Sequence, residues 1–253
     1  MTHLKNHHFI LATDLDGTFL GGDGKDRARL YDWIRSHRQD VGLIFVTGRD
    51  PDFITELCQD DDIPWPDYVV GDVGTTIARV DATQVIRPIP ALETAIREAW
   101  GNLGPRLRAA LEGHPGLRMQ NTDFRYRISY DMDPGTFDDS AVTLVEQMGA
   151  DALISDNRFF DVLPRGISKG PSLRKLLAHL DVPETRVLAA GDTLNDQSLL
   201  VAGTPAVAVG GSEKALLERL PETDRIHRAT GVGAAGIIEA IAHFALHPNI
   251  KEA

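Results

Sequence analysis

The chain has 253 residues, of which 42% are hydrophobic and 25% are charged, and this balance excludes a disordered or fibrous protein. The length is near the upper limit for one hydrophobic core, so we expect one large domain or a core that carries an insertion. A formal net charge of -11 argues against a nucleic acid or an anionic membrane as partner, because their phosphates would be repelled. With a single cysteine and no long apolar run, a soluble cytoplasmic protein is expected.

The first part of the chain alternates strand and helix patterns. Short apolar runs predict buried strands, and apolar spacing typical of helices separates them, at residues 9–12 (strand), 26–38 (helix), 41–46 (strand), 51–59 (helix) and 68–70 (strand). This alternation predicts a parallel sheet with right-handed crossover connections. Residues 71–77 are expected to lead into an exposed hairpin.

The pattern changes between about residues 85 and 164. We expect a helix at 92–111, strands at 117–120 and 126–130, a helix at 134–148, and strands at 152–154 and 159–163. The alternating pattern then resumes with helices at 169–180, after 192 and at 234–244, and strands at 186–190 and 206–209. The expected fold is therefore α/β, with a Rossmann-like parallel-sheet core at residues 1–84 and 165–253 and an inserted α+β domain at 85–164.

Two carboxylates, Asp14 and Asp16, directly follow the first strand. Residues two apart in an extended chain point the same way, so both can face one site, and Gly17 lets the backbone bend sharply afterwards. Two carboxylates about 4 Å apart repel by roughly 4 kcal/mol at an effective dielectric constant of about 20, so the pair requires a cation or a shared proton. A plain Asp-Gly turn is the alternative that these residues alone leave open.

Polar residues stand at three further junctions of strands and helices. Thr47 and Gly48 end the second strand, Lys169 opens a helix, and residues 191–196 follow a later strand. Such junctions fall on one edge of an open parallel sheet, where ligands bind, so we expect them to converge on Asp14. Singly, Thr47 is explained as a helix cap and Lys169 as a surface residue. Together they favour an active site.

These four segments resemble the signature set of the haloacid-dehalogenase superfamily of phosphotransferases, over essentially the whole chain. The insertion after the third core strand resembles the subgroup with an α/β (type IIB) cap. Segments 46–49, 73–75, 127–130 and 161–170 are similar to sucrose-phosphate phosphatases and related disaccharide-phosphate phosphatases. Asp50, Thr76 and Arg127 stand where serine, an acidic residue and lysine are common, which bears on the particular sugar.

The resemblance and the residues agree on a phosphoric monoester hydrolase. Asp14 is expected to attack phosphorus and form an aspartyl-phosphate, and Asp16 to protonate the leaving sugar oxygen and then activate water. Lys169 would offset the charge of Asp14 and phosphate, while Thr47 and nearby backbone N–H groups would hold the phosphoryl oxygens.

Magnesium is the expected cofactor, because it prefers oxygen ligands. Its expected ligands are the carboxylates of Asp14 and Asp192 and the backbone carbonyl of Asp16, with Asn195 and Asp196 in support.

The inserted domain is expected to read the leaving group. Residues suited to the phosphate or to sugar hydroxyls are Gly48, Arg49, Gln120, Arg125, Arg127 and Ser129. By alternation Arg125, Arg127 and Ser129 share one face of a strand, and the alternative is that this face is the solvated side of a sheet. The expected partner is a small phosphorylated sugar, most of all a disaccharide phosphate such as sucrose 6-phosphate. The alternative is mannosyl-3-phosphoglycerate or another small phosphorylated metabolite.

Two other functions compete with the phosphatase. Residues 231–236 fit the G-x-G-x-x-G spacing of dinucleotide-binding proteins, but too little chain follows for the second strand and its acidic residue. A non-enzymatic phospho-acceptor module would also place acidic residues and a lysine around a parallel sheet. Asp16 as an acid/base and the large insertion favour the enzyme.

Overall fold

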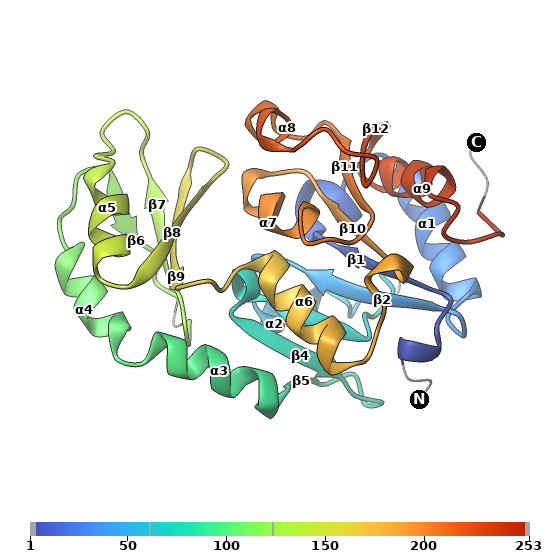
Figure 1. The fold of residues 1–253 in the computed structure, drawn as a ribbon, viewed down its shortest axis with the longest axis horizontal. Helices are drawn as coiled ribbons and strands as arrows, with labels where there is room; N and C mark the ends of the chain where they lie inside the picture. Colours follow the sequence, from blue (N-terminus) through green and yellow to red (C-terminus); the bar gives the residue numbers. More distant parts are fainter. Residues whose placement is uncertain (1–3, 61, 123, 251–253) are drawn as a thin grey trace.

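The computed structural model describes residues 4–60, 62–122 and 124–250. They form two parts side by side, each built on its own sheet (Figure 1). The strands are β1 (Phe9–Thr13), β2 (Val41–Val46), β3 (Tyr68–Gly71), β4 (Thr76–Val80), β5 (Ile86–Pro88), β6 (Leu117–Met119), β7 (Ile128–Met132), β8 (Ala150–Ser155), β9 (Phe159–Pro164), β10 (Val187–Gly191), β11 (Ala206–Gly210) and β12 (Ile226–Val232). The helices are α1 (Gly24–Ser36), α2 (Pro51–Leu57), α3 (Pro90–Trp100), α4 (Leu103–Ala110), α5 (Ser140–Gln147), α6 (Lys169–His179), α7 (Gln197–Leu200), α8 (Lys214–Arg219) and α9 (Ala234–His243).

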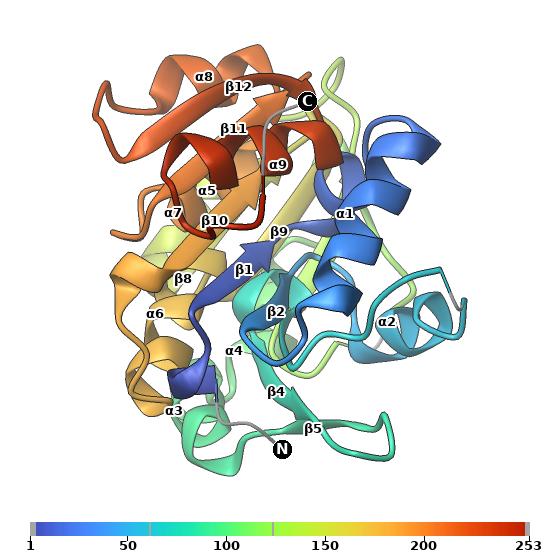
Figure 2. The ribbon, with the colours of Figure 1, turned by 90° about the vertical axis from the view of Figure 1, so that its right-hand side faces the viewer.

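The larger part, which we call the core, holds an eight-stranded sheet in the order β12-β11-β10-β1-β2-β3-β4-β5. All strands from β12 to β3 run parallel to their neighbours, and β4 and β5 are antiparallel. Apolar side chains of α1, α2 and α9 pack on one face, and those of α6, α7 and α8 pack on the other, so the strands lie between two layers of helices (Figure 2). The predicted parallel-sheet α/β class is confirmed.

The smaller part, from α3 to β9, is called the inserted unit. Its sheet has the antiparallel order β6-β7-β9-β8. Tyr130 of β7 and Phe160 of β9 face α4 and α5 in an apolar cluster. Their neighbours Ser129 and Asp161, which pair directly across the two strands, face the core. One face of this sheet is therefore free to form a roof over the core.

Several expected elements differ in the structure. The helix expected at 92–111 is two helices, because Gly101 adopts φ +48° between α3 and α4. The helix expected from residue 134 begins at Ser140, after a turn in which the Asp133 carboxylate accepts from the N–H of Gly135. The expected hairpin after residues 71–77 is present, because β4 pairs antiparallel with β5 around the exposed residues 82–85. The first half of β4 is buried, and β4 also pairs with β3.

Three further elements, β5, α8 and β12, were not expected from the sequence. Strand β5 pairs with β4 in the core sheet, although residues 86–88 fall in the range expected for the inserted domain. The chain returns to the core after β9, which ends at Pro164. No helix in the described ranges is long and apolar enough to cross a membrane.

Candidate active site

Asp14 stands at the carboxyl end of the central strand β1. Its N–H donates to the carbonyl of Ala190 at 2.9 Å, which extends the pairing of β1 with β10 by one residue. Three residues later the backbone turns at Gly17, with φ +75°. A Cβ atom there would lie 2.2 Å from Oδ2 of Asp192, so only glycine lets that carboxylate approach. The local sequence thus brings the ends of β1 and β10 together.

Lys169, at the start of α6, is fully buried and joins three acceptors. Its Nζ donates to Oδ1 of Asp14 at 2.8 Å, of Asn195 at 2.7 Å and of Asp196 at 2.6 Å. Burial alone would lower the pKa of Lys169, but the carboxylates of Asp14 and Asp196 raise it above its ordinary value, so the ammonium stays charged. Lys169 is therefore a structural cation of the site and not a surface residue.

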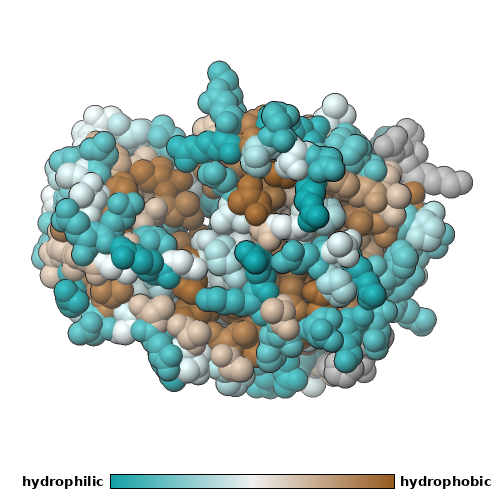
Figure 3. All heavy atoms as spheres, viewed as in Figure 1, coloured by the Kyte–Doolittle hydropathy of each residue, from teal (hydrophilic) through white to brown (hydrophobic). Residues whose placement is uncertain are grey.

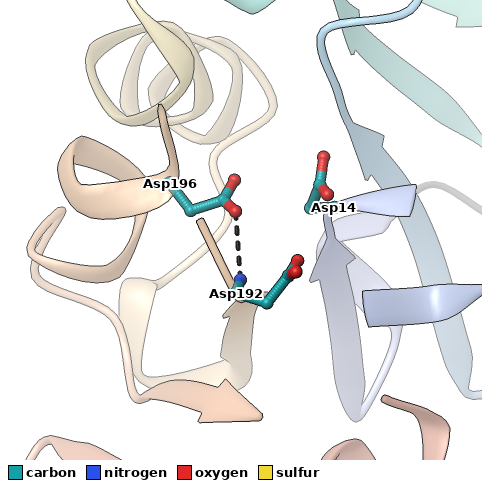
Figure 4. A group of neighbouring side chains, drawn as sticks. All are labelled: Asp14, Asp192 and Asp196. Carbon is teal, nitrogen blue, oxygen red and sulfur yellow. Dashed lines mark hydrogen bonds between the residues drawn. The ribbon is translucent and has the colours of Figure 1, made fainter. Parts of the chain in front are cut away.

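An all-carboxylate cluster surrounds this cation. Single oxygens of Asp14, Asp192 and Asp196 lie within 4.8 Å of one another, and the three side chains face a common space (Figure 4). Burial is the largest cause that raises the pKa of Asp14, and it raises that of Asp192 to about 7. A cation bound nearby would lower the raised pKa values of Asp14 and Asp192 again. The carboxylate oxygens of the cluster therefore suit a hard divalent ion such as Mg²⁺.

The members of this cluster differ in how many oxygens they have free. Asp196 accepts from Lys169 through Oδ1 and from the N–H groups of Asp192 and Thr193 through Oδ2. Asp192 accepts from the hydroxyl of Thr18 at 2.6 Å through Oδ1 only. Asn195 accepts from Lys169 and from the Thr193 hydroxyl. Asp14 and Asp192 are thus the carboxylates best placed to bind a cation, while Asp196 and Asn195 hold Lys169.

Asp16 points into the same region but is paired with Arg49. Two hydrogen bonds join them, from Nε to Oδ2 at 2.8 Å and from Nη2 to Oδ1 at 3.0 Å. The Arg49 guanidinium also stacks over the ring of Phe53, 4.4 Å from its centre. Both side chains are about half exposed, so the pair can open without exposing a buried charge.

Thr47 is fully buried at the end of β2, and its Oγ1 accepts from the N–H of Arg49 at 3.1 Å. The loop 47–49 is fixed by a second turn, since Asp72 N donates to the Arg49 carbonyl and Val73 N to the Thr47 carbonyl. The loop therefore has a defined backbone beside Asp14.

A cavity of about 520 Å³ lies between the core and the inserted unit. The surface is hollowed between these two parts on the face drawn in Figure 3. The core supplies Asp14, Asp16, Gly48, Arg49, Asp50, Val73, Thr193 and Asn195, and the inserted unit supplies Gln120, Thr122, Phe124, Arg127, Ser129, Ser155, Asp156, Arg158, Phe159 and Asp161. Eight of the expected site residues thus meet in one cavity, with Lys169, Thr47, Asp192 and Asp196 beside its floor.

Arg125 is a fifth expected site residue that lies outside this lining. Its guanidinium donates to Glu93 of α3 and to Oγ1 of Thr76, the latter at 3.1 Å. Strand β7 begins at Ile128, so the strand alternation expected for Arg125, Arg127 and Ser129 does not cover the two arginines. In the structure Arg125 ties the inserted unit to β4, and its contact with the substrate stays a prediction.

Sequence reasoning missed several lining residues, notably Phe124, Arg158 and Asp161. Phe159 and Asp161 lie two apart on β9, so the same alternation used for β7 would have placed them on one face. The turn before them, Asp156-Asn157, has both φ angles positive, and Asn and Asp are the residues that tolerate this.

The G-x-G-x-x-G segment has a packing role in the structure. A Cβ atom at Gly233 would lie 2.2 Å from the backbone of Gly21. The N–H groups of Thr230 and Gly231, which could otherwise face an anion, donate to the carboxylate of Glu239. The glycines thus allow the start of α9 to contact the loop after β1, and two N–H groups at the start of the motif are already paired with Glu239.

A model of the sucrose-6F-phosphate phosphohydrolase family matches residues 7–245. The chain belongs to this family. The sucrose-phosphatase of Synechocystis sp. PCC6803, solved in complex with sucrose and phosphate, is similar with a TM-score of 0.85 and 26% identity, over 94% of this chain and 98% of that one. The family lies within the haloacid-dehalogenase hydrolases, as the sequence motifs indicated.

Two other similar proteins are named for substrates or products other than sucrose phosphate. The chain is 39% identical over 236 residues to a glucosylglycerol-phosphate synthase of Pseudomonas anguilliseptica. That alignment covers 93% of this chain but only 30% of the synthase. It is 28% identical over 251 residues to a mannosylfructose-phosphate phosphatase of Agrobacterium fabrum, covering 95% of this chain and 98% of that one. The chain therefore spans less than a third of the synthase it matches and nearly all of the phosphatase.

Proposed function

We propose that this protein is a magnesium-dependent phosphatase that removes the phosphate from a glycosylated sugar or polyol. The observation that carries the proposal is the buried Asp14, held by Lys169 beside the Asp192 carboxylate, at the floor of a cavity roofed by polar residues. The inserted unit then acts as the cap that covers the substrate and contacts its leaving group.

The chemistry follows from the free atoms of the site. Oδ1 of Asp14 accepts from Lys169, so Oδ2 is the atom available to attack phosphorus and form the aspartyl-phosphate. Thr47 and the backbone N–H groups of its loop hold the phosphoryl oxygens, and Lys169 offsets the negative charge. When bound at Asp14, Asp192 and the Asp16 carbonyl, Mg²⁺ supplies positive charge to the transferring group.

Asp16 supplies the proton to the leaving sugar oxygen and later takes one from the attacking water. Both of its oxygens accept from Arg49 in the structure, so this role requires the pair to open. A phosphoryl group is the natural acceptor for the released guanidinium, because arginine binds carboxylate and phosphate with the same two-donor geometry. Arg49 and Gly48 thereby contact the phosphate, while Gln120 and Ser129 face the sugar.

Two substrates are favoured by specific observations. Sucrose 6-phosphate is supported by the family model and by the Synechocystis relative. Glucosylglycerol phosphate is supported by the more similar Pseudomonas relative. Both carry a neutral polyhydroxylated leaving group, which suits a cavity in which two of the arginines, Arg49 and Arg127, already have acidic neighbours.

The test is release of inorganic phosphate with Mg²⁺ from a panel of both substrates, mannosylfructose phosphate, mannosyl-3-phosphoglycerate, a hexose 6-phosphate and an aryl phosphate. We expect many turnovers per enzyme and the highest kcat/KM for a glycosylated sugar or polyol. Release of at most one equivalent would instead indicate a phospho-acceptor module. A strong preference for the phosphoglycerate or the hexose monophosphate would refute the substrate class.

A further inference from the structure

Arg127 belongs to the inserted unit, but its charged group is fixed to the core. The side chain is 6% exposed and stacks over the ring of Phe124, 3.6 Å from its centre. Its Nη1 donates to the backbone carbonyl of Gly48 at 3.1 Å. Because Gly48 lies in the loop 47–49 beside Asp14, this hydrogen bond joins the roof of the cavity to the main chain of its floor.

Two buried carboxylates, one from each part of the molecule, lie next to this guanidinium. Asp72 of the core and Asp161 of β9 each lie 3.8 Å from a terminal nitrogen of Arg127. Asp72 accepts from the Thr76 hydroxyl, and Asp161 accepts from Ser129. Burial raises the pKa of Asp72, and Arg127 partly offsets that rise. Arg127 is thus the cation that separates two carboxylates carried by different parts of the molecule.

Asp72 belongs to a turn whose backbone is strained. Asp72 and Val73 have φ +52° and +58°, and a β-branched residue such as Val73 rarely adopts this left-handed conformation. The turn persists because its N–H groups bind the carbonyls of Arg49 and Thr47. A Cβ atom at Gly74 would lie 2.4 Å from the backbone of Ser168, next to Lys169. The position of Asp72 is therefore tied both to the loop 47–49 and to the start of α6.

Building on the proposed function, we propose that Arg127 is a positioning residue that couples closure of the inserted unit to the geometry of the loop 47–49. It does so through Gly48 and Asp72 and does not read the sugar. Its Nη1 is already hydrogen-bonded to the Gly48 carbonyl, and its terminal nitrogens lie 3.8 Å from the two carboxylates. A sugar that accepted from Nη1 would have to displace the bond to the core. Without the guanidinium, Asp72 and Asp161 would both lose their ion-pair partner, and the tie between the two parts would weaken.

This role makes a prediction that a sugar-reading role does not. Arg127→Met should lower kcat/KM for a glycosylated sugar phosphate and for an aryl phosphate by the same factor, on the order of 10- to 100-fold. Arg127→Lys should restore part of the activity on both substrates, since a single ammonium can satisfy only some of the contacts. The matched control is Arg106→Met, since Arg106 is exposed on α4 and has no ion pair among the described residues. It should match the wild type.

A double substitution tests whether the buried carboxylates next to Arg127 cause the loss of activity. Asp72→Asn added to Arg127→Met should raise activity above that of Arg127→Met alone, because it removes one of the uncompensated carboxylates. Backbone amide exchange, measured without substrate, should be faster at Gly48 and Arg49 in Arg127→Met than in the wild type or in Arg106→Met. This measurement does not depend on turnover, so it decides the positioning role even if the wild type proves inactive on the whole panel and the proposed function fails.

Two results would overturn the inference. One is a loss confined to the sugar phosphate with the aryl phosphate unaffected, which would make Arg127 a reader of the leaving group. The other is unchanged amide exchange in the loop 47–49 of a folded Arg127→Met protein.

Discussion

Replacing Lys169 with methionine keeps an apolar side chain of similar length and removes the ammonium group. This substitution tests how much Lys169 stabilises the buried carboxylates around it. Nζ of Lys169 lies 2.8 Å from Asp14 and 2.6 Å from Asp196, and the acidic oxygens of the cluster lie within 4.8 Å of one another. At that separation two ionised carboxylates repel by roughly 3–4 kcal/mol at an effective dielectric constant of about 20. Removing one partner of a buried ion pair costs about 3–5 kcal/mol. We therefore expect Lys169→Met to lower the free energy of unfolding by about 3–5 kcal/mol.

Urea denaturation in the presence of a chelator measures this loss. With a slope of about 2 kcal/mol/M, the midpoint should fall by about 2 M. Lys175→Met, on the same helix but only partly buried and without an ion pair among the described residues, should stay close to the wild type. Added Mg²⁺ should recover part of the loss, because a bound cation takes over the compensation of Asp14 and Asp192.

The loss should also depend on pH. Burial already raises the pKa of Asp14 and of Asp192, and without Lys169 the folded cluster binds more protons than the unfolded chain. Stability of the variant then decreases as pH rises, so the deficit relative to wild type should be larger near about pH 8 than near about pH 5. A deficit below about 1 kcal/mol, or one that is equal at both pH values, would refute the reasoning.

Four further predictions concern the reaction. Asp14→Asn should abolish turnover and keep the fold, because an amide cannot attack phosphorus; multiple turnover by the purified variant would contradict the nucleophile role. Asp16→Asn should lose most activity on sugar phosphates and less on aryl phosphates, whose leaving groups need little protonation, and equal losses would indicate that Asp16 mainly positions the metal. Chelation should abolish activity and Ca²⁺ should inhibit it through its looser coordination, so full activity after chelation would exclude the metal. Gly17→Ala, whose Cβ would lie 2.2 Å from Asp192, should raise the Mg²⁺ concentration for half-maximal activity by about 10- to 100-fold, and an unchanged titration would remove Asp192 from the ligands.

The elements that sequence predicted well are those whose signal is local. Buried parallel strands are continuous apolar runs, so β1, β2 and β10 were recognised together with the polar residues at their ends. Asp14 and Thr47 converge because strand ends of one parallel sheet share an edge, which needs no knowledge of side-chain contacts. Lys169 joins them from the start of α6.

The elements that were missed depend on tertiary contacts. Helices α3 and α4 share one apolar periodicity, and only the positive φ of Gly101 divides them. Arg125 and Arg127 look alike in the sequence, yet one binds Glu93 and the other Gly48, because the chain is not yet a regular strand at these positions. The contact between Arg127 and Asp72 joins residues far apart in the chain, and no local pattern encodes it.

The position of β1 in the middle of the core sheet sets the order in which the protein can fold. One edge of β1 pairs with β2, its neighbour in the chain, but the other pairs with β10, where Ile10 lies opposite Val187. During synthesis β1 therefore keeps an unpaired apolar edge until the whole inserted unit and α6 have been made. Closing so long a loop slows folding and leaves a site for intermolecular strand pairing, so a nascent chain stopped before β10 should depend on chaperones or aggregate.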